Sequence, residues 1–344
     1  MKQLNQRQQN ILSFLLKSGM VSNADIVTHM EGEVSRFTVL RELDLLLKEG
    51  LIVKSGKGRA ISYSLRSNRK INTFFDLDSY FKDGPDKRDV KDFNPMIINE
   101  LHDLFSEEEV GKLIEVNNRY LKRLEDRTDN FLKREIERIT IELSWKSSQI
   151  EGNTYSLIDT ELLIRDRIEP VGHKKEEAIM ILNHKSAIDY IFSHNNEFKK
   201  IELFHIEKIH ELLTRGMGVK KGVRDDVLRI IGTRFMPMEG RLNIIELLNR
   251  SIDKINTMQD PFSKALSIIL MVSYIQPFED GNKRAARILG NAILLANNAC
   301  PLSYRSIDEG YYKKAILMFY EQNSALAFKE LFIEQFNFAV DNYF

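Results

Sequence analysis

The sequence predicts a mainly α-helical protein with a small N-terminal unit that also contains a β-hairpin. Apolar residues recur at helical spacing over most of the 344 residues, whereas residues 51–54 and 60–65 are rich in β-formers. The composition, 43% apolar and 29% charged, is that of an ordinary globular chain long enough for two or three domains. Because the net charge is zero, composition alone does not indicate a nucleic-acid or membrane partner.

Several classes of protein are excluded before any motif is considered. The single Cys300 excludes an intramolecular disulfide, and the seven histidines show neither a CxxC nor an HExxH zinc spacing. The longest apolar stretch, residues 265–275, is shorter than the roughly 20 residues that cross a bilayer. The N-terminus is polar and shows no signal-peptide pattern. We therefore expect a cytoplasmic protein with no membrane partner.

The N-terminal unit is expected over residues 1–66. A helical pattern over 5–18 stops at Gly19, Ser22 is placed to cap a short second helix, and Ser35 is placed to start a third helix that ends at Gly50. Two strands, 51–54 and 60–65, flank the turn 55–58. Three helices followed by a hairpin resemble a winged helix-turn-helix.

The local charge of this unit favours DNA as its partner. Residues 1–66 contain ten Lys or Arg and six Asp or Glu, a net charge of +4, so the remainder of the chain carries −4. Arg36, Thr38 and Arg41 are expected near the start of the third helix, where a recognition helix meets DNA, and Lys57 with Lys54 and Arg59 in the wing. A protein-docking role remains the alternative, because winged helices also bind proteins.

The remainder of the chain is expected to be a linker followed by a helical domain. Residues 67–94 are polar but contain several Phe and Tyr, which predicts a linker that packs on another part of the protein. Helical patterns dominate residues 95–344. The exception is 227–235, VLRIIGTRF, which is β-branched, interrupted by Gly232 and predicted as a small hairpin.

The segment SYIQPFEDGNKRAARILGN, residues 273–291, has the parts of a phosphate site. Pro277 limits a preceding helix, Gly281 permits a turn, and Asn282 is placed to cap a second helix. Unpaired N–H groups at a helix N-terminus bind anions, and the guanidinium groups of Arg284 and Arg287 suit a polyphosphate. Asp280, or else Glu279, is the candidate ligand of a bridging Mg²⁺. The two arginines taken alone would indicate only a solvated face.

This segment resembles the Fic-domain motif, His-x-Phe-x-[Asp/Glu]-Gly-Asn-[Gly/Lys]-Arg-x-x-Arg. Phe278, Asp280, Gly281, Asn282, Lys283, Arg284 and Arg287 match it position by position. At the position of Lys283 the sequence resembles the Doc branch of the family. At the position of Arg287 it resembles the AMP-transferring branch. The resemblance extends over about residues 95–344 and implies an all-helical Fic domain. It also implies nucleotide binding by Gly281, Asn282, Lys283, Arg284 and Arg287, with ATP and Mg²⁺ as the cofactors.

The resemblance fails at the position of the family's histidine, which is occupied by Gln276. In the family that histidine deprotonates a Ser, Thr or Tyr hydroxyl of a target protein, which then attacks the α-phosphate of ATP. An amide cannot take up that proton, so AMP transfer (AMPylation) is expected to be impaired. His205 and His210 are the candidates for a substitute base.

A second match lies upstream, at SSQIEGN, residues 147–153. It is similar to the family's inhibitory motif, [Ser/Thr]-x-x-x-Glu-[Gly/Asn], in the class with an N-terminal inhibitory helix, here expected near 141–151. Ser147 and Glu151 are four residues apart and share one helix face. The resemblance implies autoinhibition, with Glu151 pairing with Arg287 and withdrawing it from the γ-phosphate of ATP. An ordinary Glu before a helix-ending Gly is the alternative.

The hairpin expected at 227–235 resembles the family's flap, which binds an extended target segment. Val227, Arg229, Ile231 and Gly232 are the residues that this resemblance assigns to target binding, and a purely structural hairpin is the alternative.

Two functions remain open from the sequence. The first is a nucleotide-responsive DNA-binding transcription regulator with little or no catalysis, and the second is an autoinhibited protein adenylyltransferase, a nucleotidyltransferase, that uses a substitute base. The expected partners are ATP, a protein target and DNA. The sequence leaves open whether the protein forms a homodimer, and it does not show whether Gln276 is the natural residue.

Overall fold

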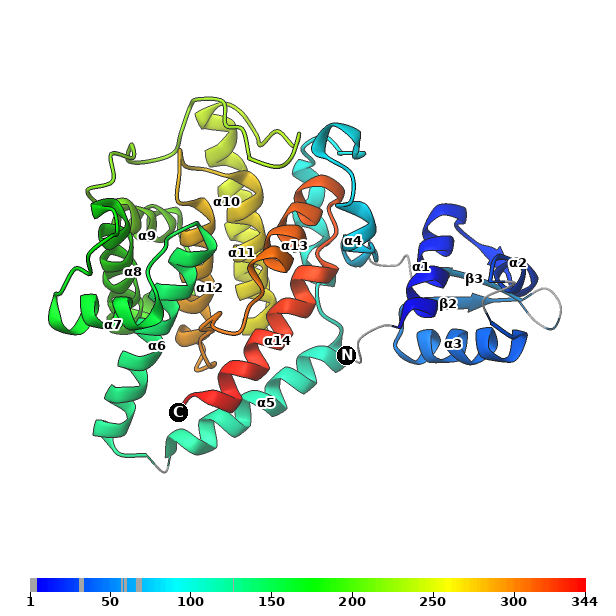
Figure 1. The fold of residues 1–344 in the computed structure, drawn as a ribbon, viewed down its shortest axis with the longest axis horizontal. Helices are drawn as coiled ribbons and strands as arrows, with labels where there is room; N and C mark the ends of the chain where they lie inside the picture. The colour runs from blue at the N-terminus through cyan, green and yellow to red at the C-terminus, as the bar shows by residue number, and fades with distance from the viewer. Residues whose placement is uncertain (1–4, 31–33, 57, 59–60, 66–69, 126) are drawn as a thin grey trace.

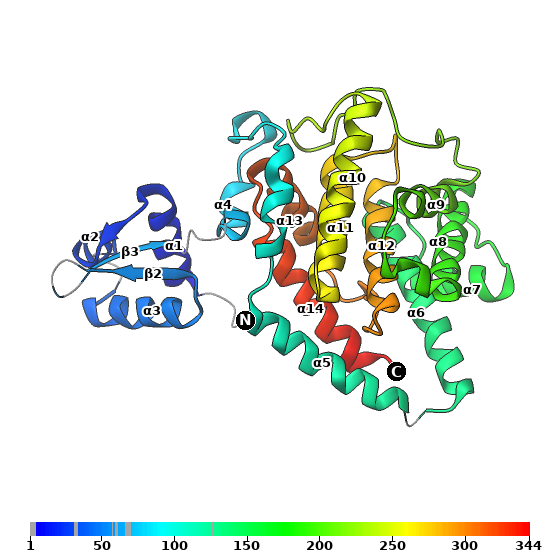
Figure 2. The ribbon, with the colours of Figure 1, turned by 180° about the vertical axis from the view of Figure 1, so that it is seen from behind.

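The computed structural model describes residues 5–30, 34–56, 58, 61–65, 70–125 and 127–344. Most of the described chain is helical, as the sequence predicts, and its strands lie in the N-terminal unit. Figures 1 and 2 show this unit beside a larger helical body in which α11 and α12 occupy the centre. The two parts have separate apolar cores.

The N-terminal unit contains three helices and a three-stranded antiparallel sheet in the order β1-β3-β2. Ser22 and Ser35 cap the second and third helices, as predicted from the sequence, because each side chain accepts a hydrogen bond from an N–H of the first turn. The two-residue strand β1 was not predicted; it pairs Val21 with Tyr63. The elements are α1 (Gln6–Ser18), β1 (Val21–Ser22), α2 (Asn23–His29), α3 (Arg36–Lys48), β2 (Ile52–Ser55) and β3 (Ser62–Leu65).

The segment after this unit packs on the helical body. It contains short helical turns, and the long helices follow it. The elements in chain order are η2 (Lys70–Asn72), α4 (Leu77–Tyr80), η3 (Pro85–Lys87), η4 (Pro95–Asp103), α5 (Glu107–Glu125), α6 (Asp129–Ile150), α7 (Leu157–Asp166), α8 (Lys175–Ser193), η5 (Asn195–Lys199), α9 (Leu203–Thr214), α10 (Arg241–Thr257), α11 (Pro261–Ile275), α12 (Asn282–Ala296), α13 (Glu309–Gln322) and α14 (Leu326–Asn342).

Helices α11 and α12 form the centre of the core. Almost every side chain of α11 is buried, as expected for a helix that is apolar on all sides. Gly290 permits the close approach of α12 to α11, because a Cβ there would lie 2.6 Å from Ile269 Cδ1. The loop between these two helices is thereby held on a rigid support.

The predicted hairpin at 227–235 is not formed. The structure has no strand in this segment; its arms are irregular and the chain turns at Ile231 and Gly232. Two contacts with Arg88 hold the turn: the Arg88 guanidinium donates to the Gly232 carbonyl, and Arg234 donates to the Arg88 carbonyl at 2.7 Å. Side-chain contacts from a distant segment therefore replace a ladder of backbone hydrogen bonds.

Arg88 also forms a buried ion pair with Glu321 of α13. Its Nε and Nη2 atoms lie 2.9 and 2.7 Å from the two carboxylate oxygens of Glu321, which is fully buried. Tyr80 donates a further hydrogen bond to the same carboxylate. This geometry ties the segment between the N-terminal unit and the helical body both to α13 and to the turn at Gly232.

Removal of Arg88 is expected to be strongly destabilising. Arg88→Ala would leave the Glu321 carboxylate buried without its cation, and breaking such a pair costs about 3–5 kcal/mol. Denaturant unfolding would measure this loss. The Arg88→Ala, Glu321→Ala double variant should lose less than the sum of the two single variants, since it leaves no unpaired charge. Additive losses would contradict the pairing.

Candidate nucleotide site at the start of helix α12

The loop 276–281 connects α11 to α12 through two residues with positive φ. Gln276 ends α11 at φ 51°, and Gly281 precedes α12 at φ 80°. A Cβ on Gly281 would lie 3.1 Å from Thr214 Cγ2, so both the backbone angle and the space favour glycine. The Asn282 side chain closes the loop, with 2.8 Å hydrogen bonds to both the N–H and the C=O of Phe278. The N-cap is thus Gly281, which corrects the predicted capping role of Asn282.

The first turn of α12 has the properties of an anion site. The N–H groups at the start of a helix have no partner within it, and the helix dipole places positive charge there. Lys283, Arg284 and Arg287 lie in the first two turns of the same helix. Each of these cations is paired with a carboxylate in the structure.

Glu151, the C-cap residue that follows α6, binds two of these cations. One carboxylate oxygen lies 2.9 Å from Arg287 Nη2 and the other 3.1 Å from Lys283 Nζ. Burial alone would raise the pKa of Glu151, but the charges of Arg287 and Lys283 outweigh it and lower the pKa to about 2. The carboxylate therefore stays charged at neutral pH.

Arg287 is fully buried, and its guanidinium donates to further partners besides Glu151. Its Nε and Nη2 atoms bind the hydroxyl and the carbonyl of Ser147, and Nη1 donates to the Tyr312 hydroxyl at 3.1 Å. Burial alone would lower the pKa of the guanidinium, but Tyr312 and Glu151 outweigh the effect of burial and raise this pKa. Ser147 and Glu151, at the C-terminal end of α6, and Tyr312 of α13 thus hold the Arg287 guanidinium in place.

His184 of α8 supports this arrangement and was not identified from the sequence. Its Nδ1 lies 2.9 Å from the Met180 carbonyl, so Nδ1 carries the proton and Nε2 accepts from the Ser147 hydroxyl at 2.9 Å. Burial, with a smaller contribution from Arg284, lowers the pKa of His184 to about 3. A neutral imidazole therefore orients the Ser147 hydroxyl, whose oxygen accepts from Arg287.

Arg284 faces a different set of partners. Its Nη2 lies 2.7 Å from Asp280 Oδ2, and its Nη1 lies 3.5 Å from Met217 Sδ. The arginine is buried whereas the Asp280 side chain is 63% exposed. A single exposed carboxylate beside a phosphate site fits Mg²⁺, which binds through one or two carboxylates together with substrate phosphates. The described residues contain no cluster of three or more His, Cys, Asp or Glu that could hold a metal unaided.

The Gln276 side chain points into the core. Its amide nitrogen donates to the Ser273 carbonyl at 2.6 Å and to the Tyr320 hydroxyl at 3.2 Å. The backbone at this point is held by Arg224, whose Nε lies 2.7 Å from the Gln276 carbonyl and whose N–H donates to the Pro277 carbonyl. The sequence did not indicate this role of Arg224, because it depends on a contact between residues 52 positions apart.

Of the two candidate substitute bases, His210 lies at the loop. Its ring stacks on Phe278 with centroids 3.7 Å apart, and its Nε2 lies 2.9 Å from the Asp280 carbonyl, so Nε2 carries a proton. Burial is the main reason that its pKa falls to about 4. His205 caps the start of α9 instead, where its Nδ1 accepts from the Glu202 N–H. Both rings thus have structural hydrogen bonds.

Among the residues assigned to target binding, Val227 lines a cavity that also includes Glu279 of the loop 276–281. Val227, Arg229, Ile231 and Gly232 are exposed, and Ile231 is 97% exposed. The volume of this cavity is about 310 Å³, and it is lined by residues 220–228, Arg241 and Glu279. This cavity connects the segment to the loop, since Glu279 also accepts a hydrogen bond from the Lys220 N–H.

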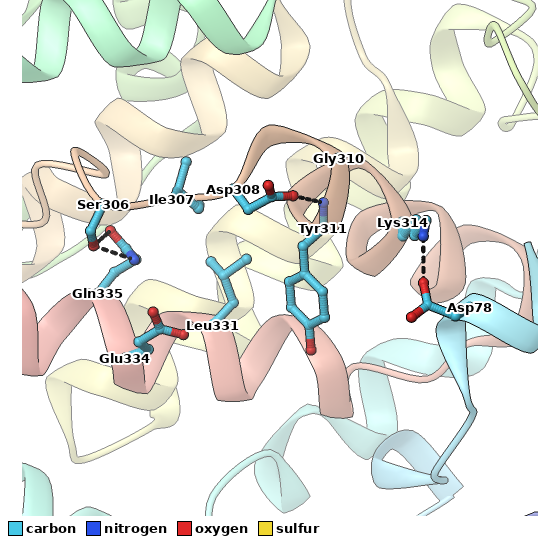
Figure 3. A pocket seen from close by; sticks show the side chains of 10 residues that line it. All are labelled: Asp78, Ser306, Ile307, Asp308, Gly310, Tyr311, Lys314, Leu331, Glu334 and Gln335. Carbon is cyan, nitrogen blue, oxygen red and sulfur yellow. Dashed lines mark hydrogen bonds and ion pairs between the residues drawn. The ribbon is translucent and has the colours of Figure 1, made fainter. Parts of the chain in front are cut away.

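A larger cavity, of about 430 Å³, lies between α13, α14 and Asp78 (Figure 3). None of the nucleotide-site residues lines it. Figure 3 shows Asp308 bound to the N–H of Tyr311 and Lys314 bound to Asp78, so the polar groups on its rim largely satisfy one another. This cavity is therefore not the candidate active site.

Three of the residues predicted to contact DNA lie on one helix. Arg36 and Thr38 are in the first turn of α3 and Arg41 follows one turn later, with a side chain that is 70% exposed. Lys57 lies outside the described residues. No helix in the described ranges is long and apolar enough to cross a membrane.

Comparison with known proteins identifies the class of domain. Residues 200–294 match the Fic/DOC family, and the chain contains a Fic/DOC family domain. The chain is 28% identical over 176 residues to the protein adenylyltransferase Fic of Aedes aegypti, which is 49% of this chain and 34% of that protein. It is 33% identical over 100 residues to a probable protein adenylyltransferase of Aquifex aeolicus, 28% of this chain and 31% of that protein.

Solved structures agree on the fold. A fragment of Fic-1 from C. elegans superposes with a TM-score of 0.58 at 18% identity, over 69% of this chain and 70% of that one. A Fic-domain signalling protein from Bacteroides thetaiotaomicron superposes with a TM-score of 0.57 at 20% identity, over 67% of this chain and 94% of that one. The chain spans only about a third of the length of the two curated relatives described above.

Proposed function

We propose that the chain binds ATP with Mg²⁺ at the start of α12 and that Glu151 restrains this binding. The observation that supports this most strongly is the ion pair of Glu151 with both Arg287 and Lys283 at the N-terminal end of α12. Phosphate oxygens would satisfy the same two cations and the same N–H groups. Binding of the triphosphate therefore competes with Glu151 for Arg287.

The residues around the loop suit a nucleotide. Gly281, Asn282 and Lys283 would supply N–H groups to the phosphates, and Arg284 would add a guanidinium once Asp280 turns from it to Mg²⁺. The metal would neutralise charge on the phosphates when bound. The exposed side chain of Asp280 can rotate to hold it without disturbing the core.

Catalysis is impaired in this proposal because no base stands at position 276. In AMP transfer a target hydroxyl oxygen forms a bond to the α-phosphate, pyrophosphate leaves, and the hydroxyl proton must be taken up. Both amide hydrogens of Gln276 are committed to Ser273 and Tyr320, and an amide has no useful proton affinity. Positioning and charge stabilisation by α12 remain, so the site is suited to binding more than to turnover.

The N-terminal unit supports a role on DNA. Its order of helix, helix, helix and hairpin is that of a winged helix-turn-helix, and its third helix exposes Arg36 and Arg41. The segment that follows is bound to α13 and to the turn at Gly232 through Arg88. Since α13 also contacts Arg287 through Tyr312, nucleotide binding has a physical route to the segment that follows the N-terminal unit. We therefore propose a nucleotide-responsive DNA-binding regulator.

An autoinhibited protein adenylyltransferase is the second candidate. It is favoured by the curated relatives, which are named as protein adenylyltransferases, and by the presence of Arg284, Arg287 and Glu151. The exposed residues 227–232 would then bind an extended segment of the target protein. His210 would be the base, which requires its ring to give up the hydrogen bond to Asp280.

Measurement of DNA affinity with and without ATP and Mg²⁺ tests the regulator. Binding should weaken linearly with the logarithm of salt concentration, and Arg41→Ala should reduce that slope by about 0.9 because one phosphate contact is lost. The Glu151→Gly variant should show a larger response to ATP than the wild type. Affinity that is insensitive to salt, or identical with and without nucleotide in both proteins, would contradict this role.

A further inference from the structure

The ring of Phe37, in the first turn of α3, is the most exposed aromatic side chain of the described residues. It is 87% exposed, compared with 58% for Phe204 and 38% for Tyr311. The packing of the N-terminal unit does not depend on it, because α3 contributes Val39, Leu43 and Leu46 to the core from its opposite face. A single exposed apolar side chain is common on protein surfaces, so the neighbours of Phe37 decide whether it belongs to a contact surface.

The neighbours of Phe37 are basic. Arg41 follows it by four residues, so the two side chains lie on the same helix face one turn apart, and Arg36 is also exposed. Towards the C-terminal end of this face Lys48 is paired with Asp44, whereas near the start of the helix Arg36 is exposed and the largely exposed Arg41 lies 3.5 Å from the buried Glu42 carboxylate. Residues 1–66 carry a net charge of +4. The partner of this face must combine negative charge with an apolar group.

Duplex DNA has this combination in its major groove. Phosphates line the groove, and the C5 methyl of thymine is the apolar group presented among the base edges. In helix-turn-helix proteins the first residues of the recognition helix contact base edges, which is the position that Phe37 occupies. Arg36 and Arg41 flank it, as residues that bind phosphates would.

Resting on the DNA-binding part of the proposed function, we propose that Phe37 contacts a thymine methyl group in the major groove. The DNA site of this protein then contains a T·A pair opposite the first turn of α3. Phe37 determines specificity at that pair, whereas Arg41 contributes affinity that does not depend on sequence.

Replacement of thymine by uracil tests this directly, since it removes only the methyl group. The full-length protein is first used to select a duplex from a random-sequence pool, and each thymine of that duplex is then replaced in turn by deoxyuridine. At one position of the selected site the wild type should bind about fourfold more weakly, the effect of one buried methyl group. Phe37→Ala should bind both duplexes equally, and Phe37→Leu should retain part of the difference.

Arg41→Ala is the matched control. It should weaken binding to the thymine and uracil duplexes by the same factor and leave their ratio unchanged, while its salt slope falls. A wild type that does not distinguish the duplexes at any position, or a Phe37→Ala variant that still does, overturns the role of Phe37 and leaves DNA binding in place. Failure of the wild type to select any duplex overturns the DNA-binding part of the proposed function itself, as a protein-docking role for α3 would produce.

Discussion

The Gln276→His, Glu151→Gly double variant is expected to transfer AMP from ATP to itself or to a target protein. The histidine supplies the missing base, which is worth about 10²–10⁴ in rate. Histidine tolerates the left-handed backbone angle found at position 276 better than most side chains. Incubation with ATP labelled at the α-phosphate, followed by detection of label on protein, measures the effect.

The single variants are the controls for this experiment. Glu151→Gly frees Arg287 and Lys283 but leaves the target hydroxyl protonated, and Gln276→His leaves both cations paired with Glu151. The two changes should therefore be more than additive, as expected for groups that act on one transition state. A silent double variant that still binds ATP would contradict the idea that the base alone is missing. The segment 227–235 would then be the next region to compare with active proteins.

Removal of the Glu151 charge is expected to increase the affinity for ATP and Mg²⁺ by roughly 10- to 100-fold. The estimate corresponds to the about 1.5–3 kcal/mol of a hydrogen bond to a charged group, which the triphosphate no longer has to displace. Titration calorimetry on the wild type, Glu151→Gly and Glu151→Gln would measure it. The Gln variant keeps the shape of the side chain, so it separates the loss of charge from the loss of a side chain at the end of α6.

Arg287→Ala combined with Glu151→Gly provides the opposite control. This protein lacks both the inhibitory carboxylate and the guanidinium that it restrains, so its affinity should fall below that of Glu151→Gly alone. Equal affinities in these two variants would mean that Arg287 does not bind nucleotide. The ion pair with Glu151 would then have only a structural role.

Features determined by neighbouring residues could be predicted from the sequence. The ranges of α1 and α3, the caps Ser22 and Ser35 and the turn at Gly281 depend on residues a few positions apart, and the structure contains all of them. The Fic/DOC domain could also be recognised, because its motif is contiguous.

Features that depend on distant contacts could not be predicted. The orientation of Ser147 by His184 joins residues 37 positions apart, and the support of the loop by Arg224 joins residues 52 apart. Residues 227–235 have β-branched side chains, but a two-stranded hairpin alone is only marginally stable in water. Here Arg88, far away in the sequence, holds the turn by its side chain, and the arms do not pair.

The central claim is that this Fic domain binds nucleotide and lacks a base. The measurement that tests it most directly is incubation of Glu151→Gly, with Gln276 retained, in α-labelled ATP and Mg²⁺, with bound and covalently attached label determined in the same sample. The account predicts saturable ATP binding with little label on protein. Strong labelling would contradict it and would direct mutagenesis to His210, whereas absence of binding would remove the phosphate site at the start of α12.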